Sequence, residues 1–297
     1  MASDVELAAM RHAITLSALG LGTTSPNPPV GCVILSQDGT IVGAGFHRRK
    51  GEPHAEVHAL TAAGNAAHGG TAVVTLEPCN HVGVTPACRQ ALLDAGVSRV
   101  IIGVIDPTSR GEGGAATLAA AGVEVETDVL HDEALTVLRT WLTATTRRRP
   151  YLTWAYAPDD GRQQAAEGHL LLDLRGGADL VVADKTLYEG IPGGHAAEHF
   201  ALPGEADIDV GPLRWLSAAY AVGARSVLVV GHEYAEALRS QLHAIDEVII
   251  SVSRADPSKA LNIVDPGLIP NDFHLVAMTT AADSLRVHLR RSAHNMK

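Results

Sequence analysis

The side chains that most restrict how this chain can fold lie in three short segments, because together they can bind one metal ion. His54 and Glu56 are separated by one residue, Cys79 follows a proline, and eight residues separate Cys79 from Cys88. One imidazole and two thiolates can hold zinc and leave one coordination position for water, as in catalytic zinc sites. The fold must therefore bring these segments together.

The carboxylate of Glu56 gives this predicted site its chemistry. Bound zinc lowers the pKa of a water molecule toward about 7, and a nearby carboxylate can move the proton of that water. H-x-E followed by P-C-x-x-C is the pattern of zinc-dependent nucleobase deaminases. This chain keeps the first part and widens the gap between the cysteines to eight residues. We therefore predict hydrolytic deamination, with zinc held by His54, Cys79 and Cys88 and with Glu56 as the catalytic proton carrier.

The same residues allow two other interpretations. A closed structural zinc site would take His81 as its fourth ligand, but Glu56 would then have no role. Alternatively, His54 only caps a helix and the cysteines fill the core, which the joint pattern disfavours. Cys32 lies inside an apolar run, and we interpret it as a small buried hydrophobic residue.

The composition indicates a packed protein without a dedicated nucleic-acid surface. Hydrophobic residues make up 46% and charged residues 19%, and the net charge is −10. Phosphate recognition needs clustered Lys and Arg, and the one basic run, residues 147–149, is predicted to be a solvated linker. The N-terminal segment is typical of neither a signal peptide nor a membrane span. We expect a cytoplasmic protein, where the thiols stay reduced, with no nucleic-acid or membrane partner.

Helical and strand patterns alternate along the chain and predict two α/β domains, residues 1–146 and 150–297. Ser3 and Glu6 form a capping-box pair at the start of the first helix. The first domain is predicted to be a three-layer αβα unit, with strands at 30–35, 41–46, 71–76, 100–105 and from 123, and further helices at 54–63, 89–95, 115–121 and 131–144. The second domain is predicted to have strands at 152–156, 179–182, 226–230, 247–252, 273–276 and 285–289, and a loop at 190–211.

With these motifs in view, the chain resembles the bifunctional riboflavin-biosynthesis deaminase–reductases. The matching segments are SPNPPVG at 25–31, GAGFH at 43–47, GEPHAEVHA at 51–59, TLEPCNH at 75–81 and TPAC at 85–88. The wide gap between the cysteines is typical of this family, and the match is dense over about residues 5–150. The resemblance implies a cytidine-deaminase-like αβα domain in which Asn27, His47 and His81 hold the substrate.

The resemblance also implies a substrate, the small phosphoribosylated diaminopyrimidinone of riboflavin biosynthesis, and a homo-oligomer, either a dimer or a tetramer. Val84 stands where similar proteins have Lys or Arg. We therefore expect that this phosphate contact either is missing or comes from another residue, such as Arg48, Arg49 or Lys50. Deamination of another nucleotide-like aminopyrimidine remains the alternative that Val84 suggests.

Family members carry a second domain that is folded like dihydrofolate reductase and uses NADPH, and here the resemblance is weaker. Residues 153–157, 160–162 and 226–231 resemble its opening strand, turn and a later strand. However, Ala155 replaces a lysine, and Val230 and His232 replace the first and last residues of Glu-Gly-Gly. We predict a shortened reductase-like α/β domain that keeps the fold; NADPH stays open as its cofactor, but these replacements disfavour NADPH-dependent hydride transfer. Dimerisation, partner binding and an altered site remain open as its role.

Overall fold

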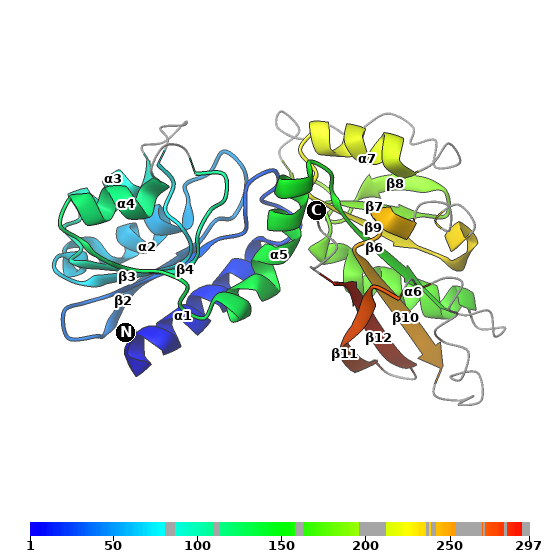
Figure 1. Ribbon diagram of the computed structural model, residues 1–297, viewed down its shortest axis with the longest axis horizontal. Helices are drawn as coiled ribbons and strands as arrows, with labels where there is room; N and C mark the ends of the chain where they lie inside the picture. The colour runs from blue at the N-terminus through cyan, green and yellow to red at the C-terminus, as the bar shows by residue number, and fades with distance from the viewer. Residues whose placement is uncertain are drawn as a thin grey trace. The chain divides into compact units, whose positions relative to one another are not determined.

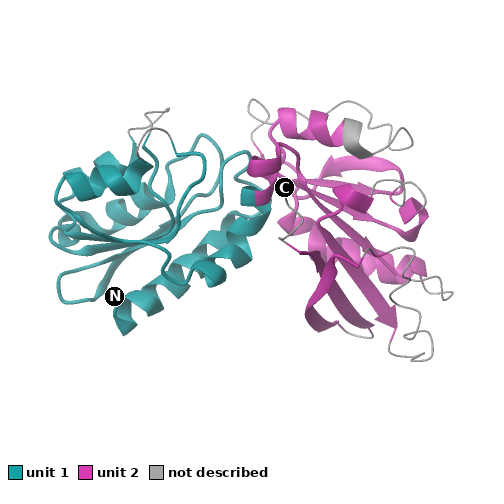
Figure 2. Cartoon of the chain, in the orientation of Figure 1, with its two compact units in different colours: residues 1–142 teal, residues 143–297 magenta. Residues whose placement is uncertain are grey.

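The computed structural model divides the chain into two compact units, residues 1–142 and 143–297 (Figure 2). It describes residues 1–80, 87–109, 113–157, 163–195, 212–235, 238, 242–253, 269, 271–281 and 284–292. The boundary between the units falls inside helix α5 (His131–Arg147). Within the described ranges, no helix combines the length and the apolar character that crossing a membrane requires.

Unit 1 is built on a five-stranded sheet of order β2-β1-β3-β4-β5. Its strands are β1 (Gly31–Leu35), β2 (Ile41–Phe46), β3 (Thr71–Leu76), β4 (Arg99–Val104) and β5 (Glu124–Glu126). β1 runs antiparallel to β2 and β3, whereas β3, β4 and β5 are parallel. β1 and β3 are almost entirely buried. β1 has no polar side chain and β3 has only those of Thr71 and Thr75, as expected for strands that are covered on both faces.

Helices cover both faces of this sheet and make three layers. α1 (Asp4–Ser17) and α5 lie on one face, and α2 (Ala55–Ala63), α3 (Cys88–Asp94) and α4 (Gly113–Ala120) lie on the other (Figure 1). The predicted capping box of Ser3 and Glu6 is confirmed at the start of α1. The carboxyl end of β3 and the starts of α2 and α3 carry the predicted metal ligands.

Glycines in β2 allow α2 to pack unusually close to the sheet. A Cβ atom on Gly45 would lie 2.5 Å from the Cβ atom of His58 and 2.8 Å from the backbone nitrogen of Ala59. Gly43 makes an equally close approach, with the carbonyl oxygen of Ala59 2.2 Å from the position of a Cβ. The absence of side chains at these two positions therefore sets the distance between α2 and the sheet. That distance in turn determines where His54 and Glu56 lie.

Unit 2 contains a seven-stranded sheet of order β11-β12-β10-β6-β9-β7-β8. Its strands are β6 (Tyr151–Tyr156), β7 (Leu180–Ala183), β8 (Thr186–Glu189), β9 (Ser226–Val230), β10 (Glu247–Ser253), β11 (Phe273–Ala281) and β12 (Ser284–Arg291). The four central strands, β10, β6, β9 and β7, are parallel. Sequence patterns predict all of these strands except β8.

Two helices that the sequence analysis does not predict, α6 (Gln163–Leu174) and α7 (Pro212–Ala221), supply the two cores of unit 2. Alternate residues of β6 face opposite ways. Trp154 belongs to the cluster that contains Leu216 of α7. Ala155 belongs to the cluster that contains Leu170 of α6. The sheet of unit 2 is therefore covered on both faces, in agreement with the predicted α/β class.

The basic run 147–149 is not a solvated linker, and that prediction is wrong. Arg147 and Arg149 both contact the carboxylate of Asp246, which is 3% exposed. The same carboxylate accepts a hydrogen bond from the backbone N–H of Leu152 at 2.9 Å. A buried carboxylate needs such partners, so the segment that leads into β6 is held against the end of β10. Spacing along the chain could not reveal a partner about a hundred residues away.

Candidate metal centre

His54 lies at the N-cap position of α2, but its side chain makes no capping hydrogen bond. Its Nδ1 atom lies instead 3.1 Å from Sγ of Cys88 and 3.8 Å from Sγ of Cys79. Cys79 follows β3, and Cys88 is the first residue of α3. The end of one strand and the starts of two helices thus bring the three predicted ligands to one place.

The distances among these ligand atoms fit zinc. All three lie within 4.8 Å of one another. A tetrahedral zinc ion, with bonds of roughly 2.0 Å to nitrogen and 2.3 Å to sulfur, separates its ligand atoms by about 3.5–3.8 Å. Small adjustments of the side chains bring the donors to that spacing. One nitrogen and two sulfur donors also match zinc in chemical type.

The surroundings of Cys79 favour its thiolate form, which is the form that binds a metal. A hydrogen bond from the Cys88 thiol lowers the pKa of Cys79 to about 4. The backbone N–H of Cys88 also donates to Sγ of Cys79, at 3.2 Å. In turn, the hydrogen bond with Cys79 raises the pKa of His54. The hydrogen bonds within the cluster therefore favour the thiolate form of Cys79.

Glu56 lies in the first turn of α2, two residues after His54, and is 3% exposed. Burial raises the pKa of its carboxyl group, and the neighbouring His54 opposes that rise. A carboxyl group whose pKa is moved toward neutrality can both accept and return a proton at physiological pH. Glu56 therefore has the position and the surroundings of a proton carrier beside the three ligands.

A chain of hydrogen bonds orients Asn27 near this cluster. His47 is 2% exposed, and burial lowers its pKa to about 4. Nδ1 of His47 lies 3.2 Å from the carbonyl oxygen of Pro53, which can only accept, so Nδ1 carries the proton of the neutral ring. Nε2 therefore accepts from the side-chain amide of Asn27, at 3.2 Å. The His47 ring also packs edge-on against His54, with centroids 5.1 Å apart.

Glu77, which the sequence analysis does not single out, organises the segment just before the Pro78–Cys79 pair. Its carboxylate accepts hydrogen bonds from the backbone N–H of Ala115 at 2.9 Å, the hydroxyl of Ser109 at 2.7 Å and the backbone N–H of Asp106 at 3.2 Å. Glu77 is 6% exposed. It thus ties the end of β3 to the start of α4 and to the loop after β4. Only the three-dimensional contacts reveal this role.

Two further residues named by the sequence analysis, His81 and Val84, lie outside the described residues. The alternative in which His81 is a fourth zinc ligand therefore stays a prediction. Arg48 is exposed, and Arg49 and Lys50 are half-buried. They directly follow His47 in the chain, and the hydroxyl of Thr23 donates to the backbone carbonyl of Arg48 at 2.7 Å.

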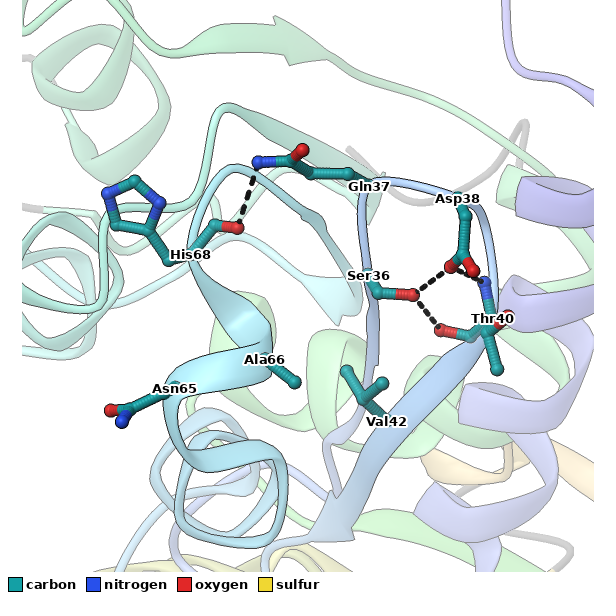
Figure 3. A pocket seen from close by; sticks show the side chains of 8 residues that line it. All are labelled: Ser36, Gln37, Asp38, Thr40, Val42, Asn65, Ala66 and His68. Carbon is teal, nitrogen blue, oxygen red and sulfur yellow. Dashed lines mark hydrogen bonds between the residues drawn. The ribbon is translucent and has the colours of Figure 1, made fainter.

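A separate hollow in unit 1 lies beside β2 and is lined by residues such as Gln37, Thr40 and His68 (Figure 3). Its polar groups pair mainly with one another: Gln37 donates to the carbonyl of His68 at 3.4 Å, and the backbone N–H of Thr40 donates to Asp38 at 3.2 Å. None of its lining residues belongs to the ligand cluster, so we do not assign the chemistry to this hollow.

A three-layer αβα unit with a His-Cys-Cys cluster beside a buried glutamate defines the class of zinc-dependent deaminases. The family model described as the cytidine and deoxycytidylate deaminase zinc-binding region matches residues 4–104. Among curated proteins, the diaminohydroxyphosphoribosylamino-pyrimidine deaminase of Buchnera aphidicola is 51% identical over 126 residues, which are 42% of this chain and 85% of that protein. The chain belongs to the riboflavin-biosynthesis deaminase family.

Longer relatives are also similar to part of the chain. The riboflavin biosynthesis protein RibD of Mycobacterium tuberculosis is 48% identical over 162 residues, which are 54% of this chain and 48% of that protein. RibD of Escherichia coli is 46% identical over 161 residues, 54% of this chain and 44% of that protein. The chain therefore spans about half the length of these curated relatives.

Solved structures extend the likeness to both units. A crystal form of RibD from Acinetobacter baumannii has a TM-score of 0.75 and 27% identity, covering 97% of this chain and 99% of that one. A deaminase/reductase from Thermotoga maritima has a TM-score of 0.77 at 23% identity, covering 97% and 99% of the two chains, and shows the shared fold. The predicted fold class, a cytidine-deaminase-like domain followed by a reductase-like domain, is confirmed.

Proposed function

We propose that unit 1 catalyses the zinc-dependent hydrolytic deamination of the phosphoribosylated diaminopyrimidinone of riboflavin biosynthesis. The observation that carries this proposal is the convergence of His54, Cys79 and Cys88 beside the buried carboxylate of Glu56. Membership of the deaminase family and the name of the Buchnera relative support the substrate. The reaction replaces a ring amine with a carbonyl oxygen, consumes one water and releases ammonia.

When bound, zinc supplies a water molecule whose pKa is lowered toward about 7, which provides a nucleophile at neutral pH. His54, Cys79 and Cys88 would hold the ion and leave one position open. Glu56 accepts the proton of the attacking water, delivers it to the ring nitrogen and then assists the departure of ammonia by proton transfer. The raised pKa of Glu56 suits both the acceptance and the return of a proton.

Asn27 is the side chain we assign to reading the pyrimidine edge. An amide has both a donor and an acceptor, which is what recognition of such an edge requires. Neutral His47 takes one amide N–H of Asn27, and that bond fixes which way the amide points. Both ring nitrogens of His47 are engaged within the chain. We therefore assign His47 to orienting Asn27 rather than to a direct hydrogen bond with the phosphate, and His81 is retained as a substrate contact.

The basic segment 48–50 is our candidate for holding the substrate phosphate, because Val84 cannot. Arg48 is exposed and directly follows His47, so its side chain can reach solvent near the candidate site. If the substrate is instead another aminopyrimidine without this phosphate, binding does not need the basic segment 48–50. Arg48→Gln should raise the KM for a phosphorylated substrate and leave the KM for a free aminopyrimidine unchanged.

We also propose that the protein is cytoplasmic and forms a homo-oligomer. Light scattering of the purified chain tests the oligomeric state.

The decisive experiment is Glu56→Gln, assayed by ammonia release from the diaminopyrimidinone phosphate and by zinc content. We expect turnover to fall by roughly 10²–10⁴-fold, the usual contribution of a general acid–base group, while zinc remains bound. Glu52→Gln removes an exposed carboxylate four residues earlier and serves as the matched control. Retained turnover in Glu56→Gln, with zinc present, would refute the proposed mechanism.

A further inference from the structure

The parallel strands of unit 2 end at an edge of the sheet where an α/β protein would be expected to bind a dinucleotide. In open α/β sheets, ligands bind outside the carboxyl ends of the strands. β6 and β9 are adjacent and parallel, so their carboxyl ends meet at one place. β9 is followed there by Gly231, whose φ of 135° favours glycine. A glycine at such a turn lets backbone approach a phosphate closely.

The backbone donors at this edge are already used. The carboxylate oxygen Oε1 of Glu167, in α6, accepts from the N–H of His232 at 2.8 Å and from the N–H of Ala157 at 3.3 Å. One carboxylate oxygen thus bridges the residues that follow the two adjacent strands. It also accepts from the side chain of Gln163 at 3.2 Å, within α6. An incoming phosphate oxygen would have to displace Glu167 to reach these N–H groups.

The open face of the glycine is covered by a second carboxylate. A Cβ atom on Gly231 would lie 2.2 Å from one carboxylate oxygen of Glu233 and 2.5 Å from the other. The space that glycine leaves beside the backbone is therefore filled by Glu233. The His232 ring lies over Tyr156, at 5.6 Å between ring centroids, and occupies a further part of the edge.

These carboxylates also make the edge electrostatically unsuitable for a phosphate. Partial burial raises the pKa of Glu233, and the neighbouring carboxylates Glu167 and Asp184 raise it further. Three acidic groups thus interact around one turn. Like charges at short range repel by an amount that is large on the scale of binding free energies.

We infer that unit 2 excludes NADPH because its own side chains, Glu167 and Glu233, occupy the position that a dinucleotide phosphate requires at the Gly231 turn. The residues present do not fit the cofactor that this fold takes in reductases, and no step through NADPH is assigned to unit 2. The inference concerns unit 2 alone and goes beyond the proposed deamination. If the deaminase proposal also holds, any NADPH-dependent reduction of its product takes place on a separate chain.

The test measures NADPH binding to the full chain by the fluorescence of the cofactor and by calorimetry. The wild-type chain should show no saturable binding, even at millimolar NADPH. Glu167→Ala frees the N–H groups of His232 and Ala157, and Glu233→Ala clears the space beside Gly231. The double variant should bind NADPH, or inorganic pyrophosphate as a simpler probe, at least about tenfold more tightly than the limit set by the wild-type chain.

Asp132→Asn, which removes a fully exposed carboxylate from unit 1, is the matched control and should bind no better than wild type. Far-UV circular dichroism and thermal unfolding establish that each variant is folded. Glu233 is exposed, so Glu233→Ala alone provides a folded variant if the double variant is unstable. Micromolar binding by the wild-type chain would overturn the inference, and so would folded variants that bind no better than wild type. Neither result bears on ammonia release, so the proposed deaminase activity is tested separately.

Discussion

At the scale of single residues, the three cysteines show how surroundings decide what one side chain does. Cys32 lies inside β1, is 0% exposed, and has its pKa raised by burial. Cys79 lies beside His54, and the hydrogen bonds that it receives lower its pKa. The first thiol stays protonated and packs as an apolar group, whereas the second is prepared for a metal. Cys88 completes the ligand set from the start of α3.

Replacement of Cys88 by serine should separate the metal role from the packing role. Serine keeps nearly the same size but is a poor zinc ligand, so we expect zinc affinity to fall at least about a hundredfold, measured by competition with a chromogenic chelator. Cys32→Ala should cost about 1 kcal/mol of unfolding free energy and leave zinc affinity unchanged. Equal zinc affinity in Cys88→Ser and wild type would remove Cys88 from the ligand set.

At the scale of helices and strands, most of unit 1 could be predicted because its signals are local. β2 and β3 have the boundaries that the apolar runs predict, and the capping box fixes the start of α1. β8 was missed because its hairpin turn, Asp184–Lys185, has positive φ at both residues without a glycine. α6 was missed because its apolar residues form no clear stripe, and only Leu170 in it is buried.

The close packing of α2 on β2 leads to a prediction about Gly45. Valine at this position would push against the backbone and His58 of α2, so we expect a loss of about 2–3 kcal/mol of unfolding free energy. Because α2 carries His54 and Glu56, zinc affinity should also fall, by roughly tenfold. Chemical denaturation and zinc competition measure the two effects.

Gly168→Ala is the natural comparison for this variant. Gly168 lies in α6, and a Cβ there would meet no atom within 4 Å, so alanine should stabilise the protein by about 0.5–1 kcal/mol. Zinc affinity should be unchanged in this variant. A Gly45→Val variant as stable as wild type would show that α2 can shift without cost.

The start of α1 is joined to the sheet by a charge network that should respond to acid. Arg99 of β4 contacts Glu6 at 2.8 Å and also contacts Glu124 and Glu126. Burial raises the pKa of Glu6, but hydrogen bonds from Ser3 and Arg99 more than compensate, so its pKa lies below the ordinary value of 4.5. The ionised carboxylate therefore stabilises the folded state.

A carboxyl group with a lowered folded-state pKa stabilises fully above its unfolded-state value and loses that contribution as the pH falls through the folded-state value. Between about pH 5 and about pH 3, wild type should lose up to about 1 kcal/mol more unfolding free energy than Glu6→Gln, since the network is partly solvated. Urea denaturation across this range measures the difference. Identical pH profiles for the two proteins would mean that Glu6 contributes nothing through its charge.

At the scale of the whole molecule, the roles that cannot be predicted from the sequence belong to residues whose partners lie far along the chain. The candidate metal ligands can be identified from sequence because their spacing is itself a signal. The roles of Glu77, Arg147 and Glu167 depend on contacts with β4–α4, β10 and β9 that no local pattern encodes. Each is a polar group whose hydrogen-bond or ion-pair partners lie far away in the sequence, so these partners can be identified only in the folded structure.

Because each unit has its own core, removal of zinc should change the local stability of unit 1 and leave that of unit 2 unchanged. We expect chelation to speed hydrogen exchange at the first turns of α2 and α3 by at least about tenfold, since the ligands there lose a shared partner. Exchange in β6 and β9 should stay as it was. Mass spectrometry of peptides from the exchanged protein reports both regions at once. A change of equal size in unit 2, or none in α2 and α3, would contradict the expectation.

The turn at Gly231 also has an evolutionary consequence. Its backbone has a glycine and two neighbouring N–H groups, and the side chains of Glu167, Glu233 and His232 lie where a phosphate would approach them. Glutamate and alanine codons differ by a single nucleotide. A laboratory selection for cofactor binding therefore has a short mutational route available to it.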